Sequence, residues 1–223
     1  MNKQVVYVGI LGTFILAGCG SKQDANEKNF SAAISQYLDK KGELCLGVKK
    51  WPVDVTETDL SFQKIIPNGT AGQMAALAAV GLVSSTDIDV NQSGTFSSKM
   101  PGRIFKVKRY TLTDAGKRFY REKEVEQFGL SGMSRVMQGD ICYGKKSVDK
   151  IVKWDVPQNL GGASETSVQY LYKIDGLADW AKSVDFQTGF PYVAQIIGDA
   201  GKREQIHGVK LTNQGWEALG LDN

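Results

Sequence analysis

The feature that most constrains this chain lies at its N-terminus. Val5–Leu16 is an uncharged apolar run that follows a short, mildly positive start, Met1–Gln4. A helix needs about 20 apolar residues to cross a bilayer, so this run is too short to span one. Its length is typical of the hydrophobic region of a secretory signal, and the residues after it are Ala17, Gly18 and Cys19. The sequence therefore predicts export of the chain.

The four residues Leu16-Ala17-Gly18-Cys19 resemble the lipobox of bacterial lipoprotein precursors at every position. The resemblance implies a signal peptide over residues 1–18, cleavage before Cys19, and acylation of Cys19 on its sulfur and on its new amine. Several acyl chains together hold a protein stably on a membrane. The alternative interpretation is a buried apolar strand that happens to precede a cysteine.

Residues 19–29 are predicted to form the lipidated, flexible tether of this lipoprotein. After Cys19 the segment has a single alanine and no larger apolar residue, so it cannot join a core. Ten such residues have a mean reach of roughly 17–19 Å. In lipoproteins of bacteria with two membranes, an Asp just after the acylated cysteine favours the inner membrane, but Gly20 and Ser21 stand there in this chain. If the host has two membranes, the resemblance therefore implies the outer membrane, with the protein facing the periplasm.

The composition of the chain is ordinary for a globular protein, with 42% hydrophobic and 23% charged residues. The formal net charge of +3 is close to neutral, which argues against a dedicated nucleic-acid binder. No other apolar run approaches the length of a membrane span, so the predicted anchor is lipid. The rest of the chain is long enough for one large domain or two small ones.

The cysteines that remain after Cys19 are Cys45 and Cys142. An even number of thiols in an exported protein is compatible with a Cys45–Cys142 disulfide. The alternative is two separate, reduced cysteines that pack as small hydrophobic residues. Spacing in the sequence does not decide between the two.

Hydrophobic periodicity predicts an α+β chain. In the first half we expect helices over 30–41, 73–83 and 114–126, the last capped by Thr113, and strands over 44–48 and 104–112. In the second half we expect strands over 141–144, 151–156, 168–174 and 208–211, helical segments over 177–182 and 214–219, and a buried segment of uncertain type over 192–197. The pair 151–156 and 168–174 is predicted to form a hairpin.

The two halves of the chain share two short patterns. Cys45-Leu46-Gly47 corresponds to Cys142-Tyr143-Gly144, and Leu112-Thr113-Asp114-Ala115-Gly116 corresponds to Leu211-Thr212-Asn213-Gln214-Gly215, at nearly equal separations. This spacing indicates two duplicated α+β units, over residues 30–126 and 139–223. In each unit the Thr would cap a helix. The alternative is that Leu-Thr-x-x-Gly is a common motif at the ends of strands and helices, and that the match is a coincidence.

The first unit also resembles a winged-helix domain. In that class a helix ending in Gly-Leu-Val leads into a basic hairpin that returns to Leu-Thr-x-x-Gly. Residues 75–83 and 110–116 match the two ends of this pattern, within a resemblance that covers residues 73–120. The resemblance implies two winged-helix-like units, of which the second keeps only the later end of the pattern. DNA is absent from the cell envelope, so no nucleic-acid partner is expected.

Catalytic motifs are missing from the sequence. His207 is the single histidine, so a site with several histidines around a metal cannot form. The chain has no Gly-x-Ser-x-Gly elbow, Ser-x-x-Lys or Cys-x-x-Cys. We therefore expect no catalytic residue, no metal and no cofactor, and an envelope enzyme is kept as the third of the functions considered.

The residues between Lys99 and Lys123 are strongly basic, because only Asp114 and Glu122 oppose the positive charges. This basic stretch is the clearest feature of the sequence that folding alone does not require. The stretch could bind an anionic glycan, lipid headgroups or an acidic protein. The alternative is a hairpin and helix kept soluble by charge. The predicted binding residues are Arg103, Lys106, Lys108, Arg109, Lys117 and Arg118.

The function predicted first is a lipid-anchored binding or interaction module, which presents this basic stretch and an aromatic face to an envelope partner. The aromatic face would comprise Trp154, Tyr170, Tyr172 and Trp180, about half of them buried. The second function is a protective lipoprotein that sequesters a toxin or an antibiotic in the periplasm, where an acidic half of the chain would capture a cationic effector.

Overall fold

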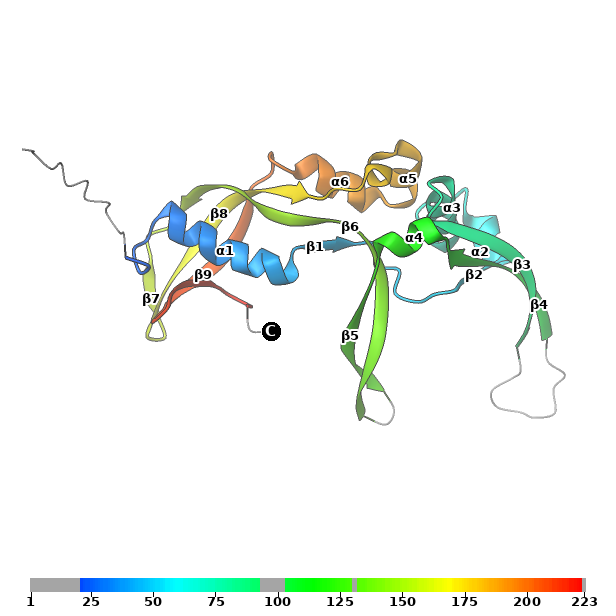
Figure 1. The fold of residues 1–223 in the computed structure, drawn as a ribbon, viewed down its shortest axis with the longest axis horizontal. Coiled ribbons are helices and arrows are strands. Elements are labelled where there is room, and N and C mark those ends of the chain that lie inside the picture. The colour runs from blue at the N-terminus through cyan, green and yellow to red at the C-terminus, as the bar shows by residue number, and fades with distance from the viewer. Residues whose placement is uncertain (1–20, 93–102, 130–131, 222–223) are drawn as a thin grey trace, which may run out of the picture.

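The computed structural model describes residues 21–92, 103–129 and 132–221 and has an elongated outline (Figure 1). Helices and strands are mixed along the chain, and all the described strand pairs are antiparallel. The structure therefore confirms the predicted α+β class. The strands form a small sheet and a large one.

The small sheet has three strands in the order β2 (Val53–Thr56), β4 (Arg103–Leu112) and β3 (Val83–Gln92). Helices α2 (Glu57–Phe62) and α3 (Thr70–Ala79) connect β2 to β3. Thr56 and Asp59 form a capping box, which starts α2 directly after the strand. Gly81, with a φ of 73°, ends the turn that separates α3 from β3.

The large sheet is organised around β6 (Gly132–Trp154), a strand of 23 residues. Along its length β6 pairs with β5 (Tyr120–Gly129), then with β1 (Glu43–Cys45), and then with β8 (Ala163–Asp175). β8 also pairs with the short β7 (Gln158–Leu160) and with β9 (Gln205–Thr212), which is followed by β10 (Gly215–Ala218). The predicted strands over 141–144 and 151–156 are thus parts of one strand.

Helix α1 (Glu27–Lys41) covers the part of the large sheet built from β6, β8, β9 and β10. Asn26 caps it, because its side chain accepts a hydrogen bond from the backbone N–H of Asn29 at 2.9 Å. The buried side chains Phe30, Ile34 and Leu38 recur at helical spacing and face the sheet. The helix predicted over 30–41 is therefore confirmed and begins three residues earlier.

The molecule has two hydrophobic cores, and each mixes residues from both predicted units. One core packs Phe30 and Ile34 against Val168 and Tyr172 of β8. The other core packs Leu77 of α3 against residues from β6 and from three short helices. These helices are η1 (Asp179–Lys182), α5 (Val184–Gly189) and α6 (Pro191–Asp199). The boundary predicted near residues 126–139 therefore does not separate two cores.

One predicted helix is too long, and another is a strand. The helix expected over 114–126 ends at Phe119, as α4 (Asp114–Phe119), and the chain continues as β5. The helix expected over 214–219 is β10, in which Trp216 and Ala218 are buried at strand spacing. Thr113 does cap α4, accepting a bond from the N–H of Gly116 at 3.0 Å, but Thr212 is the last residue of β9 and lies opposite Gly215 of β10. The matched motifs thus serve different local structures.

The hairpin predicted from 151–156 and 168–174 is confirmed by the pairing of β6 with β8, which includes Trp154 opposite Val168. The helical turn expected over 177–182 is η1, and the segment of uncertain type over 192–197 lies in α6. Periodicity did not predict β3, which pairs with β4 along ten residues; only the resemblance to winged-helix domains implied a hairpin at this place.

Candidate interaction surfaces

The basic stretch is distributed over three elements. Lys106, Lys108 and Arg109 lie on β4, which begins at Arg103, and Lys117 and Arg118 lie on α4. The remaining basic residues of the described part, Arg121 and Lys123, lie on β5. Lys99 is outside the described residues.

Three of the six predicted binding residues are paired with acidic side chains of the same molecule. Arg109 donates two hydrogen bonds to Asp54 of β2, at 2.7 and 2.6 Å. Lys108 lies 2.9 Å from Asp87 of β3, and Lys117 lies 3.0 Å from Asp114. The hydrogen bond from Arg109 holds the pKa of Asp54 below its ordinary value. Strand pairing therefore brings acidic partners to Lys108 and Arg109, and Lys117 is paired within α4.

A second surface comes from the segment between the predicted units. β5 and residues 132–141 of β6 form a two-stranded hairpin that projects from the body of the molecule, here named the arm (Figure 1). The register of the arm is regular from the pair Tyr120–Ile141 to the pair Gly129–Gly132. Opposite residues in such a pair share a face, and the faces alternate along each strand.

One face of the arm carries three large, exposed apolar side chains. Phe128 is 78% exposed and lies directly opposite Met133, which is 63% exposed. Met137 is on the same face and is 64% exposed. A two-stranded hairpin is marginally stable on its own in water, and apolar groups exposed together are typical of an interaction site. This apolar face is therefore the strongest candidate for a binding surface.

The charged side chains on the apolar face of the arm are mostly acidic. Glu122, Glu124 and Glu126 follow the same alternation as Phe128 along β5. Arg135, opposite Glu126, lies 3.6 Å from Glu126 and 3.8 Å from Glu124. Arg135 is paired with two of the three carboxylates, so the face carries more negative than positive charge and suits a partner that is both apolar and basic.

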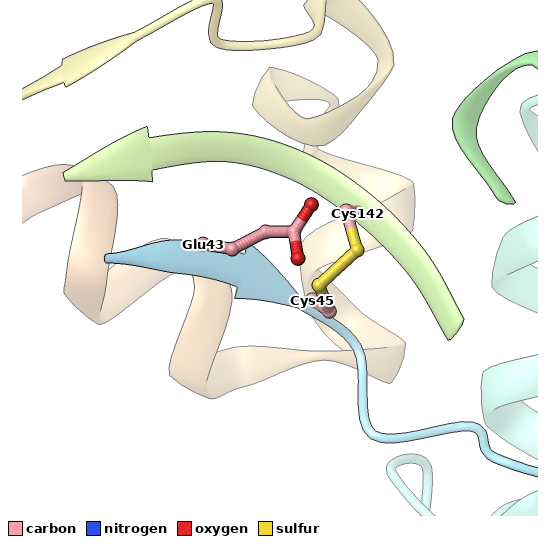
Figure 2. A group of neighbouring side chains, drawn as sticks. All are labelled: Glu43, Cys45 and Cys142. Carbon is pink, nitrogen blue, oxygen red and sulfur yellow. A yellow bond between two sulfur atoms is a disulfide. The ribbon is translucent and has the colours of Figure 1, made fainter. Parts of the chain in front are cut away.

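Cys45 and Cys142 lie opposite each other on β1 and β6, and their Sγ atoms form a disulfide. The carboxylate of Glu43 points toward this disulfide from the same strand (Figure 2). Glu43, Cys45 and Cys142 are a group of possible metal ligands within 4.8 Å, but metals bind cysteine as the thiolate. Both sulfurs are used in the disulfide, so the group does not offer the thiolates that a metal needs.

Asp140, at the base of the arm, fastens the chain that leaves β1. Its two carboxylate oxygens accept hydrogen bonds from the backbone N–H groups of Gly47 at 2.8 Å, Val48 at 3.2 Å and Ile141 at 2.8 Å. Burial raises the pKa of Asp140 above its ordinary value, although these three hydrogen bonds oppose the shift.

The imidazole ring of His207 makes contacts with the fold on two sides. Its ring lies against the ring of Tyr37, with 4.2 Å between the centroids, and its Nε2 is 3.0 Å from the carbonyl oxygen of Leu219. One ring nitrogen is therefore already used in a contact with the backbone.

The predicted aromatic face is not formed, because its members are divided between the two cores. Tyr170 and Tyr172 are buried under α1, together with Val168. Trp180 packs against Phe186 on the other core, with 4.9 Å between the ring centroids. Of the four predicted aromatic residues, Trp154 is the most accessible side chain, at 37% exposed.

The predicted lipidation site, Cys19, lies outside the described residues. Within the described part of the chain, no helix has the length and apolar character required to span a membrane. Comparisons with protein families, with curated proteins and with solved structures found no match to this chain.

The arm was not predicted as a binding surface, because residues 127–138 were placed between two units. The signal for a strand is nevertheless present. Glu122, Glu124 and Glu126 alternate with Lys123 and Val125, and alternation of this kind is typical of a strand.

Proposed function

We propose that the protein is a lipid-anchored, non-enzymatic binding module of the cell envelope that engages a partner protein through the apolar face of the arm. The observation that carries this proposal is the exposure of Phe128, Met133 and Met137 on one face of a projecting hairpin. The acidic side chains around them favour a partner segment with apolar and basic side chains.

The anchor in this proposal is the lipobox at Leu16–Cys19, with acylation of Cys19. In a host with two membranes, the residues after Cys19 favour the outer membrane, with the protein facing the periplasm. The basic stretch is a weaker candidate for an anionic partner than its sequence indicates, since Lys108, Arg109 and Lys117 are paired internally. Lys106 and Arg118 are exposed and remain candidates for such contacts.

The finer description of the fold is also a proposal. In the first half, α2 and α3 followed by the β3–β4 hairpin support a winged-helix-like unit, with β2 as the third strand. For the second half the duplication has less support, because Thr212 ends the strand β9, whereas the matched Thr113 caps a helix.

A second function, sequestration of a cationic toxin or antibiotic in the periplasm, is favoured by the acidic side chains beside Phe128. The same surface would then capture an effector in place of a resident partner. The contacts of His207 give no support to the third possibility, an envelope enzyme.

The test is site-specific photocrosslinking in intact cells. A photoreactive amino acid at Phe128 should give one discrete adduct, whereas the same group at Ile104, an exposed apolar residue of β4, serves as the matched control. The pair of substitutions Glu124→Gln and Glu126→Gln should weaken the adduct. Equal adducts at both positions, or none at Phe128, would contradict the proposal. An adduct that forms only after a cationic effector is added would select the second function.

A further inference from the structure

The segment Ser21–Asn26, predicted to be part of a flexible tether, is folded against the body. The side-chain amide of Asn29 donates hydrogen bonds to the carbonyl oxygens of Ser21 and Asp24, both at 2.9 Å. The indole N–H of Trp216, on β10, donates to the carbonyl oxygen of Gln23 at 3.1 Å. The chain is therefore fixed to α1 and β10 from Ser21 onward.

We propose that the end of the molecule around Ser21 rests on the lipid surface and that this contact fixes the orientation of the whole body. The inference depends on the proposed acylation of Cys19. Two residues span at most about 7 Å, so Cys19 cannot lie far from Ser21. The predicted ten-residue coil, by contrast, would have a mean reach of roughly 17–19 Å. The acyl chains thus hold the membrane directly against the body.

The side chains at this end fit the boundary between water and lipid. Trp154, at the end of β6, contacts Phe30 in the first turn of α1, with 5.2 Å between the ring centroids. Its ring is partly exposed, and Val156 beside it is 82% exposed. A Trp that packs on an apolar neighbour with one edge open to water is typical of membrane interfaces.

Charge makes little contribution to this contact. Basic and acidic side chains are equally numerous among the exposed residues near Ser21 and Trp154: Lys22, Lys28 and Lys153 against Asp24, Glu27 and Asp155. Attraction of a protein to anionic lipids needs an excess of Lys or Arg. The contact should therefore form equally on a bilayer of zwitterionic phospholipid.

This orientation places the opposite end of the molecule away from the bilayer. Figure 1 shows the start of α1 and β7 at one end of the long axis, and α2 and α3 at the other. The arm projects from the body between these ends, where a partner protein can reach it.

The test uses the full-length acylated protein in phosphatidylcholine vesicles that contain brominated lipid. An environment-sensitive fluorophore is attached to a single introduced thiol, in Val156→Cys or in the control Ile65→Cys. Ile65 is similarly exposed and follows α2 at the far end. The native Cys45–Cys142 pair is protected as a disulfide. We expect the brominated lipid to quench the fluorophore at position 156 and not at position 65. Equal quenching at both positions, or none at position 156, would overturn the inference.

A second variant tests the short connection itself. A flexible Gly-Ser linker of about ten residues inserted between Gly20 and Ser21 lengthens the reach of the anchor. Vesicle flotation should be retained, but quenching at position 156 should be lost. Unchanged quenching would show that the short connection does not fix the orientation.

Flotation separates this inference from the proposed function. If the protein floats with the vesicles but the fluorophore at position 156 is not quenched, the inference fails and the lipid anchor stands. If mass spectrometry finds an unacylated Cys19 and the protein does not float, both fail together.

Discussion

Phe128 and Met133 face each other across the two strands of the arm, and both side chains point into solvent. Nothing in the described part of the molecule covers them, so they contribute little to the stability of the folded state. Substitution of this pair should therefore affect binding of the proposed partner without affecting the stability of the fold.

The double substitution Phe128→Ser and Met133→Ser should leave the unfolding free energy unchanged within about 0.5 kcal/mol, because exposed surface substitutions rarely do more. The same variant should lose the photocrosslinked adduct, detected from a photoreactive group placed at Met137. Ile104→Ser is the matched control and should keep it. A large loss of stability in the double variant would show that the arm is part of the core.

Removal of the disulfide should destabilise the protein strongly. Cys45 and Cys142 are separated by 97 positions in the sequence, and closing a loop of this length is worth about 4–5 kcal/mol in the chain-entropy model. Urea unfolding of the double variant Cys45→Ser and Cys142→Ser should show a lower midpoint, equal to that of the reduced native protein. Identical unfolding midpoints of the native protein with and without reductant would show that the disulfide does not stabilise the fold.

Asp54 should make stability depend on pH in one direction. Its hydrogen bond from Arg109 lowers its pKa below the ordinary 3.8, so the ionised form is favoured in the folded state. The contribution is present above pH 3.8 and is lost as the pH falls through the lowered pKa. Asp54→Asn should therefore be less stable than the native protein at pH 7, and the difference measured by urea unfolding should shrink on acidification. If the difference in stability between the native protein and Asp54→Asn were the same at all pH values, the pairing of Asp54 with Arg109 would not stabilise the fold.

Asp140 should act in the opposite direction. Burial raises its pKa above 3.8, so in the interval between 3.8 and the raised value the folded state binds more protons than the unfolded state. Stability then falls as the pH rises through this interval. Asp140→Asn, which keeps one carbonyl oxygen for the N–H groups of Val48 and Ile141 and loses the acceptor for Gly47, should remove this decrease. If the stability of the variant fell by the same amount over this pH interval, the decrease would come from another titratable group.

The sequence predicted local features of the fold better than pairings between distant segments. The helix α1, the hairpin of β6 with β8 and the helical turn at η1 all depend on periodicity within a short window, and they are confirmed. The helix expected beyond Phe119 was wrong because Tyr120–Gly129 forms a hairpin with β6 from Gly132 to Ile141. Its alternating residues pack as a strand only when that partner is present.

The candidate site was harder to predict for a related reason. The basic stretch was counted along the chain, whereas Asp54 and Asp87, which neutralise part of it, come from β2 and β3. Summing charge within one segment cannot detect acids that strand pairing brings from elsewhere. Phe128 and Met133 were likewise overlooked, because a pair across a hairpin is visible only once the register is known.

The unbroken course of β6 also gives the molecule a mechanical axis. A force applied at the arm would travel along one backbone from Gly132 to Trp154. Because β8 runs antiparallel beside β6, the hydrogen bonds between them lie across the direction of pulling and resist it in shear, many at once. A load applied at the arm would therefore be carried by many hydrogen bonds between β6 and β8 at once, rather than by one bond after another.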